Sequence, residues 1–400
     1  MPDDEGYPAW CDACDWNVAP GLFPHHTDGP DTTWAELAPA TGTETGTAVF
    51  EELVRTGTEA RRARLSPTRL ASYGLALLVH GLSPAVLAAG LALLARNWPH
   101  PRAAATGAAL ALLSPLLRPR HPRLTTTMPR LRRPDAPRLF RLLDAVAGEL
   151  GTRGVDEIVL DPFFNAAVTS YGVRRRVLHL GLGLWYVLTP QQRVALFGHE
   201  LGHFANGDTR HGLTVGTALH TLRTWAHLLR PERRRHRAAG LPLVLPHRVV
   251  QWALGLLNRL SLHGFPRREY LADDLAARVA STEAALGLAE MLLHAQNVEE
   301  ELGRLATDEE APGDERLWSC LAEYAAAVPP REHQRLRRVS ELTWQHLDTT
   351  HPPTHLRMAL LGRRGPSASR VVCDARTARA VERELRPAAR RLAGTVVRVR

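Results

Sequence analysis

The chain contains no lysine, and cysteine, methionine and aromatic residues are all scarce. All 50 basic residues are therefore arginine, and against 41 acidic residues they give a formal net charge of +9 at pH 7. A basic balance is typical of nucleic-acid-binding proteins, but these arginines are scattered or flank apolar segments, and no nucleic-acid-binding motif is present. We therefore expect no nucleic-acid partner, and we ascribe the absence of lysine to a bias in genome composition.

Only four cysteines are present, and their spacing does not form the framework of a disulfide-stapled protein. Cysteines without such a framework indicate a reducing compartment. The first residues are acidic and lack the basic and apolar pattern of a secretory signal peptide. The soluble parts of the chain are thus expected in the cytoplasm.

Two of these cysteines, Cys11 and Cys14, form a Cys-x-x-Cys between two tryptophans within residues 1–30. The pattern resembles half of a zinc ribbon, with His25 and His26 as further candidate ligands. Because the second cysteine pair is missing, two interpretations stay open: a second zinc site, and a knuckle that has lost its metal or that a partner completes. Residues 31–66 are rich in Thr, Gly, Ala and Glu, which predicts a flexible linker.

Long apolar runs follow within residues 67–120. Residues 70–95 exceed the roughly 20 that a helix needs to cross a bilayer, and residues 103–117 form a second, shorter run. Trp98 lies between them, where an interfacial aromatic residue is expected. The alternatives are a buried core helix for the first run and a re-entrant or interfacial segment for the second, but we favour a transmembrane helical hairpin.

Arginines cluster on both flanks of this hairpin, in residues 55–69 and 118–133, whereas the connecting segment carries only Arg96 and Arg102. The positive-inside rule then places both flanks in the cytoplasm. We expect a multi-pass protein of a cell membrane, bacterial in origin, with the lipid bilayer as a partner. Two later apolar segments, 213–229 and 241–262, contain charged residues. Further membrane helices stay open there, but we favour helices on the membrane surface or packed on the soluble domain.

A soluble domain is predicted over residues 129–400. Apolar residues recur at helical spacing from residue 139 to 150, and three short strand-like runs follow at 157–160, 166–170 and 176–180, with Gly172 in a turn. A helix carrying a His-Glu-x-x-His motif comes next. This order predicts an α+β fold, mostly α, with a small β-sheet, as in zincin-like metallopeptidase domains.

The motif is His199-Glu200-Leu201-Gly202-His203. On a helix the two histidines lie four residues apart on one face, where both can bind a metal ion, usually zinc. Glu200, about 100° further round, is then placed to act as a base on a metal-bound water. Thr189 and Gln192 form a capping-box pattern that predicts where this helix begins. A chance spacing of two histidines is the alternative, so a third ligand is needed.

Glu269 is the candidate third ligand, since a carboxylate completes a His-His-Glu zinc site that leaves a fourth position open. Asp273 lies one helical turn further on, where it can accept a hydrogen bond from the outer nitrogen of a ligand histidine, most plausibly His199. The alternative is a pair of surface carboxylates that bind neighbouring arginines. Asp274 points about 100° away from Asp273, so we expect its loss to matter little.

Together with Thr350-His351-Pro352-Pro353-Thr354-x-x-Arg357, these motifs resemble those of the HtpX-type membrane zinc metallopeptidases, relatives of the CAAX prenyl and Oma-type proteases. The resemblance covers about Pro129 to Arg364 and includes Asn165-Ala166-Ala167. It implies that His199, His203 and Glu269 bind zinc, that Glu200 is the general base, and that Asp273 supports a ligand. It also implies a catalytic role for His351, in the oxyanion site or as a gate, and a structural ion pair for Arg357.

We therefore expect a membrane-anchored zinc endopeptidase, in which Glu200 assists the attack of a zinc-bound water on protein or peptide substrates. A site beside the bilayer suggests damaged membrane proteins as substrates, hence a role in quality control. An intramembrane protease is disfavoured because polar residues surround the motif. A non-catalytic zinc-binding scaffold or chaperone remains the alternative, although it would not need Glu200.

Overall fold

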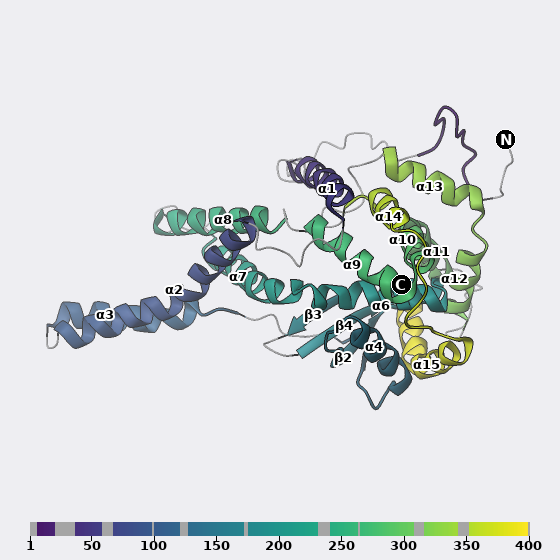
Figure 1. The fold of residues 1–400 in the computed structure, drawn as a ribbon. Helices are drawn as coiled ribbons and strands as arrows, with labels where there is room; N and C mark the ends of the chain where they lie inside the picture. The colour runs from purple at the N-terminus through teal and green to yellow at the C-terminus, as the bar shows by residue number, and fades with distance from the viewer. Residues whose placement is uncertain are drawn as a thin grey trace.

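The computed structural model describes residues 6–20, 37–57, 67–97, 100–120, 127–171, 175–230, 241–262, 265–307, 316–342 and 352–398. Figure 1 shows a rounded, mostly helical domain around one small sheet, and a helical arm that projects from one side of it. The predicted α+β class with a dominant helical content is confirmed.

The helices of the N-terminal half and the arm are α1 (Leu37–Thr56), α2 (Pro67–Asn97), α3 (Pro101–Leu113), the short 3-10 helix η1 (Ser114–Leu117), α4 (Pro137–Glu149), α5 (Leu182–Val187), α6 (Pro190–Ala205), α7 (Asp208–Leu228) and α8 (Leu241–Leu262). The helices that follow are α9 (Phe265–Ala280), α10 (Thr282–Leu292), α11 (Ala295–Thr307), α12 (Leu317–Ala326), α13 (Pro330–Leu342), α14 (Thr354–Arg363) and α15 (Ala375–Arg398).

Four strands form the sheet in the order β1-β2-β4-β3: β1 (Arg130–Leu131), β2 (Glu157–Asp161), β3 (Ala166–Tyr171) and β4 (Arg175–Gly181). β2 and β4 are parallel, and the other two pairings are antiparallel. The three predicted strands are thus present, each within a residue or so of its expected bounds. β3 lies at an edge, so one side of its backbone has no partner strand in the sheet.

The core forms because strands and helices each present one apolar face to the other. Ile158 and Leu178 lie opposite each other on β2 and β4, and both are at most 1% exposed. Phe140 and Leu143 of α4 and Phe197 of α6 belong to the same buried cluster. Six apolar residues of α4, from Leu139 to Ala147, recur at helical spacing and are buried.

The prediction of a flexible linker is wrong for residues 37–56, which form helix α1. The linker composition conceals an apolar stripe of Val49, Phe50 and Leu53 at helical spacing. Leu53 is 2% exposed and packs against Tyr270 of α9 and Leu356 of α14. Tertiary packing of that stripe therefore orders a segment whose average composition is typical of disorder.

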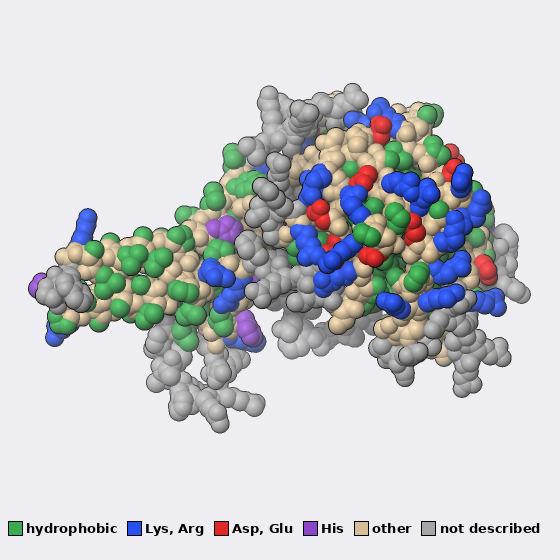
Figure 2. All heavy atoms as spheres, turned by 90° about the horizontal axis from the view of Figure 1, so that it is seen from below, with side chains coloured by type: hydrophobic (Ala, Val, Ile, Leu, Met, Phe, Trp, Pro, Cys, Tyr) green, Lys and Arg blue, Asp and Glu red, His purple; other side chains and the backbone are tan. Residues whose placement is uncertain are grey.

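Within the described parts of the chain, one helix is long and apolar enough to cross a membrane, judged by length and composition. It spans Pro67–Arg96, and its most apolar window of 18 residues has a mean hydropathy of 2.0 and is only 17% buried. This helix is α2, the long helix of the arm. Figure 2 shows that hydrophobic side chains cover much of the arm, and the exposed leucines include Leu77, Leu78, Leu82, Leu87, Leu91, Leu112, Leu113 and Leu116.

α3 folds back along α2, so the two form a helical hairpin. Ser83 and Ser114 exchange hydrogen bonds between them, and a Cβ at Gly90 would lie 2.7 Å from the carbonyl oxygen of Gly107. At 13 residues, α3 is shorter than a membrane span requires. A hairpin is therefore present, but a second membrane crossing is not supported. Trp98 lies outside the described residues.

α7 and α8 pack against α2 at the base of the arm. Val79 of α2 is buried there with Val215, Leu222 and Trp225 of α7 and Leu257 of α8. α7 and α8 therefore pack on the arm, whereas the sequence suggested the membrane surface or the soluble domain as their position. On its other side, α8 exposes Val249, Leu245 and Trp252, so it extends the apolar surface of the arm.

Candidate metal centre

Helix α6 carries the His-Glu-x-x-His motif and begins where the sequence predicted. The Thr189 hydroxyl accepts a hydrogen bond from the Gln192 N–H at 3.3 Å, and the Gln192 side chain accepts one from the Thr189 N–H at 2.8 Å. This capping box satisfies backbone donors at the first turn, and Pro190 suits the first helical position. Local sequence alone therefore sets the N-terminus of α6.

Close packing of α6 on α9 brings the third ligand to the motif. Gly198 and Gly202 lie on one face of α6, and a Cβ at Gly198 would be only 2.9 Å from the Cα of Ala276. At Gly202 it would be 3.3 Å from the Cα of Ala272. Small residues on both helices permit this approach. These positions were not singled out from the sequence, although small residues four apart on two helices were a detectable signal.

The metal-binding groups meet where the two helices cross. His199 Nε2 lies 3.4 Å from Glu269 Oε2, and His203 Nε2 lies 3.5 Å from Glu269 Oε1. A donor atom from each of the three residues lies within 4.8 Å of the others. Tetrahedral bonds of about 2.0–2.1 Å place neighbouring ligand atoms roughly 3.3–3.4 Å apart. The three side chains therefore fit one ion of zinc size.

Asp273 lies directly behind this group. Its Oδ1 accepts a hydrogen bond from Nδ1 of His199 at 2.9 Å, the contact that its spacing from Glu269 predicted. Because a carboxylate only accepts, Nδ1 carries a hydrogen, and Nε2, on the side of Glu269, is the nitrogen that can bind a metal ion once it is deprotonated. His199 is 6% exposed and Asp273 5% exposed, so water does not compete for this bond.

Arg357 of α14 forms a two-pronged ion pair with the same carboxylate. Its Nε and Nη2 donate to the two Asp273 oxygens at 2.8 and 2.7 Å, and it too is buried. Burial by itself would raise the pKa of Asp273, but Arg357 and His199 lower it to about 2. Burial likewise acts to lower the pKa of His199, but Asp273 and Glu269 raise it to about 10 in the metal-free site. The pocket thus strongly favours a cation at this point.

Asp274, whose loss we expect to matter little for zinc binding and activity, has a structural role in the fold. It is 6% exposed, as buried as Asp273, and it pairs with Arg278 at 3.1 Å and with Arg364. These arginines come from α9 itself and from the end of α14. Asp274 therefore fastens α9 to α14, although it makes no hydrogen bond to His199.

The remaining candidates differ in their placement. Glu200 is buried on α6, 6% exposed, beside His199 in the sequence. His351 lies outside the described residues.

Tyr270 was not singled out from the sequence, yet it follows Glu269, is 1% exposed, and donates a hydrogen bond to the Gly46 carbonyl of α1 at 3.3 Å. The only sequence signal for it was a large aromatic residue directly after the candidate ligand.

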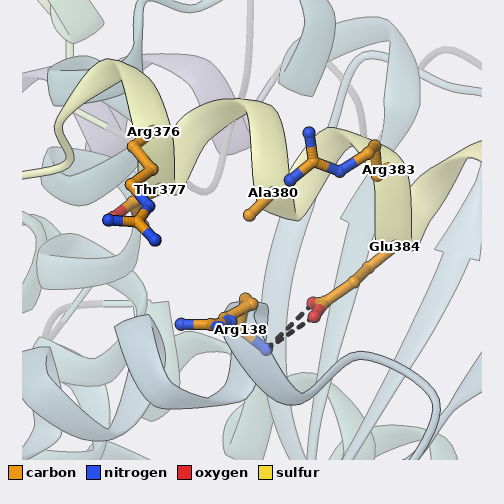
Figure 3. A pocket seen from close by; sticks show the side chains of 6 residues that line it. All are labelled: Arg138, Arg376, Thr377, Ala380, Arg383 and Glu384. Carbon is orange, nitrogen blue, oxygen red and sulfur yellow. Dashed lines mark hydrogen bonds between the residues drawn. The ribbon is translucent and has the colours of Figure 1, made fainter.

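The described residues line two pockets of similar volume. One, of about 400 Å³, borders the Asp273–Arg357 pair and is lined by residues of α1, α9 and α14. The other, of about 380 Å³, lies between α4 and α15, and none of the metal-binding candidates lines it. Figure 3 shows the Glu384 carboxylate pointing to the backbone N–H of Arg138, at 2.9 and 3.0 Å. Glu384 thus caps α4, which gives this second pocket a structural explanation.

Comparison with known proteins identifies the family. The model of peptidase family M48 matches residues 141–364, more than half of the chain. This chain belongs to peptidase family M48. Protease HtpX of Pseudomonas putida (strain GB-1) is 25% identical to this M48 chain over 163 residues, which are 38% of this chain and 55% of that protein. Protease HtpX of Pseudomonas syringae pv. tomato is 25% identical over 169 residues, 40% of this chain and 57% of that protein.

The resemblance to HtpX-type peptidases predicted from the motifs is confirmed by these matches. The chain spans only a little over half the length of the curated relatives it matches. No solved structure matches this M48 chain. The comparisons therefore fix the family, whereas the activity of the whole protein has to be argued from its own residues.

Proposed function

We propose that this M48 peptidase is a membrane-anchored zinc endopeptidase that cleaves protein substrates. The observation that carries the proposal is the convergence of His199, His203 and Glu269, whose ligand atoms lie within 4.8 Å of one another. They lie beside a buried carboxylate, Glu200, that is not needed as a ligand. A structural zinc site is closed by four protein ligands, whereas three ligands leave a position for water and substrate.

His199, His203 and Glu269 would hold the zinc ion. Zinc supplies a Lewis acid, which polarises a carbonyl oxygen and makes water more acidic. Glu200 would accept a proton from the attacking water and then deliver it to the nitrogen of the leaving amine. The position of Glu200 next to His199, on a helix fixed by its capping box, would keep the carboxylate close to the reacting water.

Asp273 and Arg357 would act as positioning residues. The Asp273 carboxylate holds the His199 ring through Nδ1, and the two-pronged Arg357 contact holds the carboxylate. A ligand imidazole that donates to a carboxylate is both oriented and more basic. His351, which precedes Pro352 in the sequence, is proposed as a group that stabilises the oxyanion or gates the site.

An extended substrate would bind along β3. This strand is an edge of the sheet, and main-chain hydrogen bonds from a peptide can extend such an edge. α2 would anchor the protein in a bilayer, and the arginines on both sides of the hairpin favour a cytoplasmic catalytic domain. Membrane proteins near the site, in a quality-control role, are the proposed substrates.

Glu200→Gln tests the chemistry, because it removes the base and keeps the shape. We expect cleavage of a fluorogenic protein substrate to fall about 10²–10⁴-fold, while zinc content measured by elemental analysis stays at that of the wild type. Glu283→Gln, an exposed position on α10, is the matched control and should change neither quantity. Zinc loss in Glu200→Gln, or cleavage equal to the wild type, would contradict the assignment and would favour a non-catalytic scaffold.

A further inference from the structure

The N-terminal segment that contains Cys11 and Cys14 is docked on helix α13. Trp10 and Val18 are 4% and 6% exposed, and they form a small buried cluster with Val339 of α13. Within the segment, the Asn17 side chain donates to the Ala9 carbonyl at 2.7 Å. Residues 9–18 therefore form an ordered module attached to the peptidase domain.

Arginines at one face of α13 hold this module by its backbone. Arg331 donates to the Trp10 carbonyl at 2.7 Å. Its guanidinium also lies over the Trp10 ring, 5.6 Å from the ring centroid, which is a cation–π contact. Arg335 donates to the Val18 carbonyl at 2.6 Å. These contacts fix the two ends of the loop that carries the cysteines.

A third arginine, Arg338, holds the middle of the loop. Its Nε and Nη2 donate to the two carboxylate oxygens of Asp15 at 2.8 and 2.7 Å. Arg331, Arg335 and Arg338 follow one another at spacings of four and three residues, so they lie on one face of the helix. Asp15 is thereby occupied as an ion-pair partner, and the loop is anchored at three points along α13.

Both cysteines lie in one closed loop. The Cys11 N–H donates to the Trp16 carbonyl at 3.1 Å, which closes the chain into a loop that contains both thiols. Asp15, directly after the second cysteine, has φ of 56°, in the left-handed region that a tight turn requires. The chain therefore turns tightly just after Cys14 and leaves this cysteine exposed.

We propose that Cys11 and Cys14 form a second metal site, which binds a thiophilic cation, Zn²⁺ or Cu⁺, through two thiolates. Cysteine binds metal as the thiolate, and the spacing of two residues between Cys11 and Cys14 is one that zinc sites use. Thiolates select these soft and borderline ions over Mg²⁺ or Ca²⁺. The two thiolates would fill two of the four positions that zinc takes, or both positions of a two-coordinate copper ion.

This site shares no residue with the metal centre on α6 and α9. Its donor atoms are sulfurs, whereas those of His199, His203 and Glu269 are nitrogen and oxygen. Spectroscopy can therefore report the two sites separately in the full-length protein. The proposal does not depend on peptidase activity, so failure of one leaves the other standing.

Cobalt substitution under reducing conditions tests the zinc form. Thiolate ligands give Co²⁺ an intense near-ultraviolet charge-transfer band that nitrogen and oxygen ligands do not. We expect this band in the wild-type protein, its loss in Cys11→Ser and Cys14→Ser, and no change in Cys320→Ser, a half-buried cysteine on α12. Zinc content should fall from two ions to one in the same two variants.

Titration with Cu⁺ against a competing chelator tests the copper form, with the same three variants. Retention of one Cu⁺ by the wild type but not by Cys11→Ser would assign copper, and the cobalt band would assign zinc. A wild-type protein that shows neither the band nor Cu⁺ retention would overturn the proposal. That outcome needs no variant, so it does not depend on whether the substituted loop still docks on α13.

Discussion

Asp273→Asn separates what this carboxylate does for folding from what it does for the metal. The substitution keeps the shape of the side chain but removes the charge that faces Arg357 and His199. Arg357 is 5% exposed, so its guanidinium would be left buried without a counter-ion. Breaking a buried pair in this way costs about 3–5 kcal/mol, which corresponds to a fall in the midpoint of thermal unfolding of roughly 6–20 °C.

The effect on the metal is a separate quantity. His199 would lose the charged acceptor of its Nδ1–H, so its ring would be less basic and less firmly oriented. Loss of such a partner typically lowers metal affinity or activity about 10–100-fold. Competition with a chromophoric zinc chelator, below the unfolding temperature of the variant, measures this affinity directly.

Two further variants separate the effect on stability from the effect on zinc affinity. Asp274→Asn is a matched control, because Asp274 is equally buried and paired with arginines but does not contact His199. It should lower stability and leave zinc affinity unchanged. In Asp273→Asn combined with Arg357→Met, stability should largely return because the unpaired charge is gone, while zinc affinity should stay low. Recovery of both quantities together, or a normal zinc affinity in Asp273→Asn, would refute the role assigned to Asp273.

Three other predictions concern the metal centre, α1 and the arm. The pKa of metal-free His199 is about 10, so zinc must displace a proton from this ring to bind. The apparent zinc affinity should therefore rise about tenfold per pH unit between about pH 7 and 9. A zinc affinity that a chelator titration finds constant over this pH range would contradict the prediction. Leu53→Ala should weaken the docking of α1 by about 2–5 kcal/mol, seen as faster hydrogen exchange in α1, whereas Glu51→Ala, at an exposed position, should not. Gly90→Ala should destabilise the arm by about 1–3 kcal/mol, because the new Cβ would lie 2.7 and 2.8 Å from backbone atoms. Gly81→Ala is the control, since a Cβ there meets nothing within 4 Å. Equal thermal stability of the two variants would show that the arm helices do not pack closely.

Local signals in the sequence were sufficient for the helix that carries the motif. Thr189 and Gln192 set its start through contacts within one turn, and the spacing of four residues places His199 and His203 on one face whatever surrounds them. The same spacing placed Glu269 and Asp273 on one face of α9. The short strands could also be predicted, because alternation and turn residues are local properties.

Other features depended on which surfaces meet in the fold. The composition of residues 37–56 is that of a linker, and only burial against Tyr270 and Leu356 makes α1 a docked helix. The length of the apolar run likewise did not reveal that α3 ends after 13 residues. For α1, the deciding energy comes from α9 and α14, which lie far away in the sequence.

The sequence by itself determined which residues could bind the metal ion, and the tertiary structure decided which side chains the neighbouring carboxylates contact. The spacing from Glu269 distinguishes Asp273 from Asp274 in the sequence, but it does not reveal that both carboxylates pair with arginines. The crossing of α6 and α9, set by Gly198 and Gly202 against small residues of α9, turns Asp273 toward His199. Helical spacing fixes which residues share a face, but the contacts of that face depend on how the helices pack.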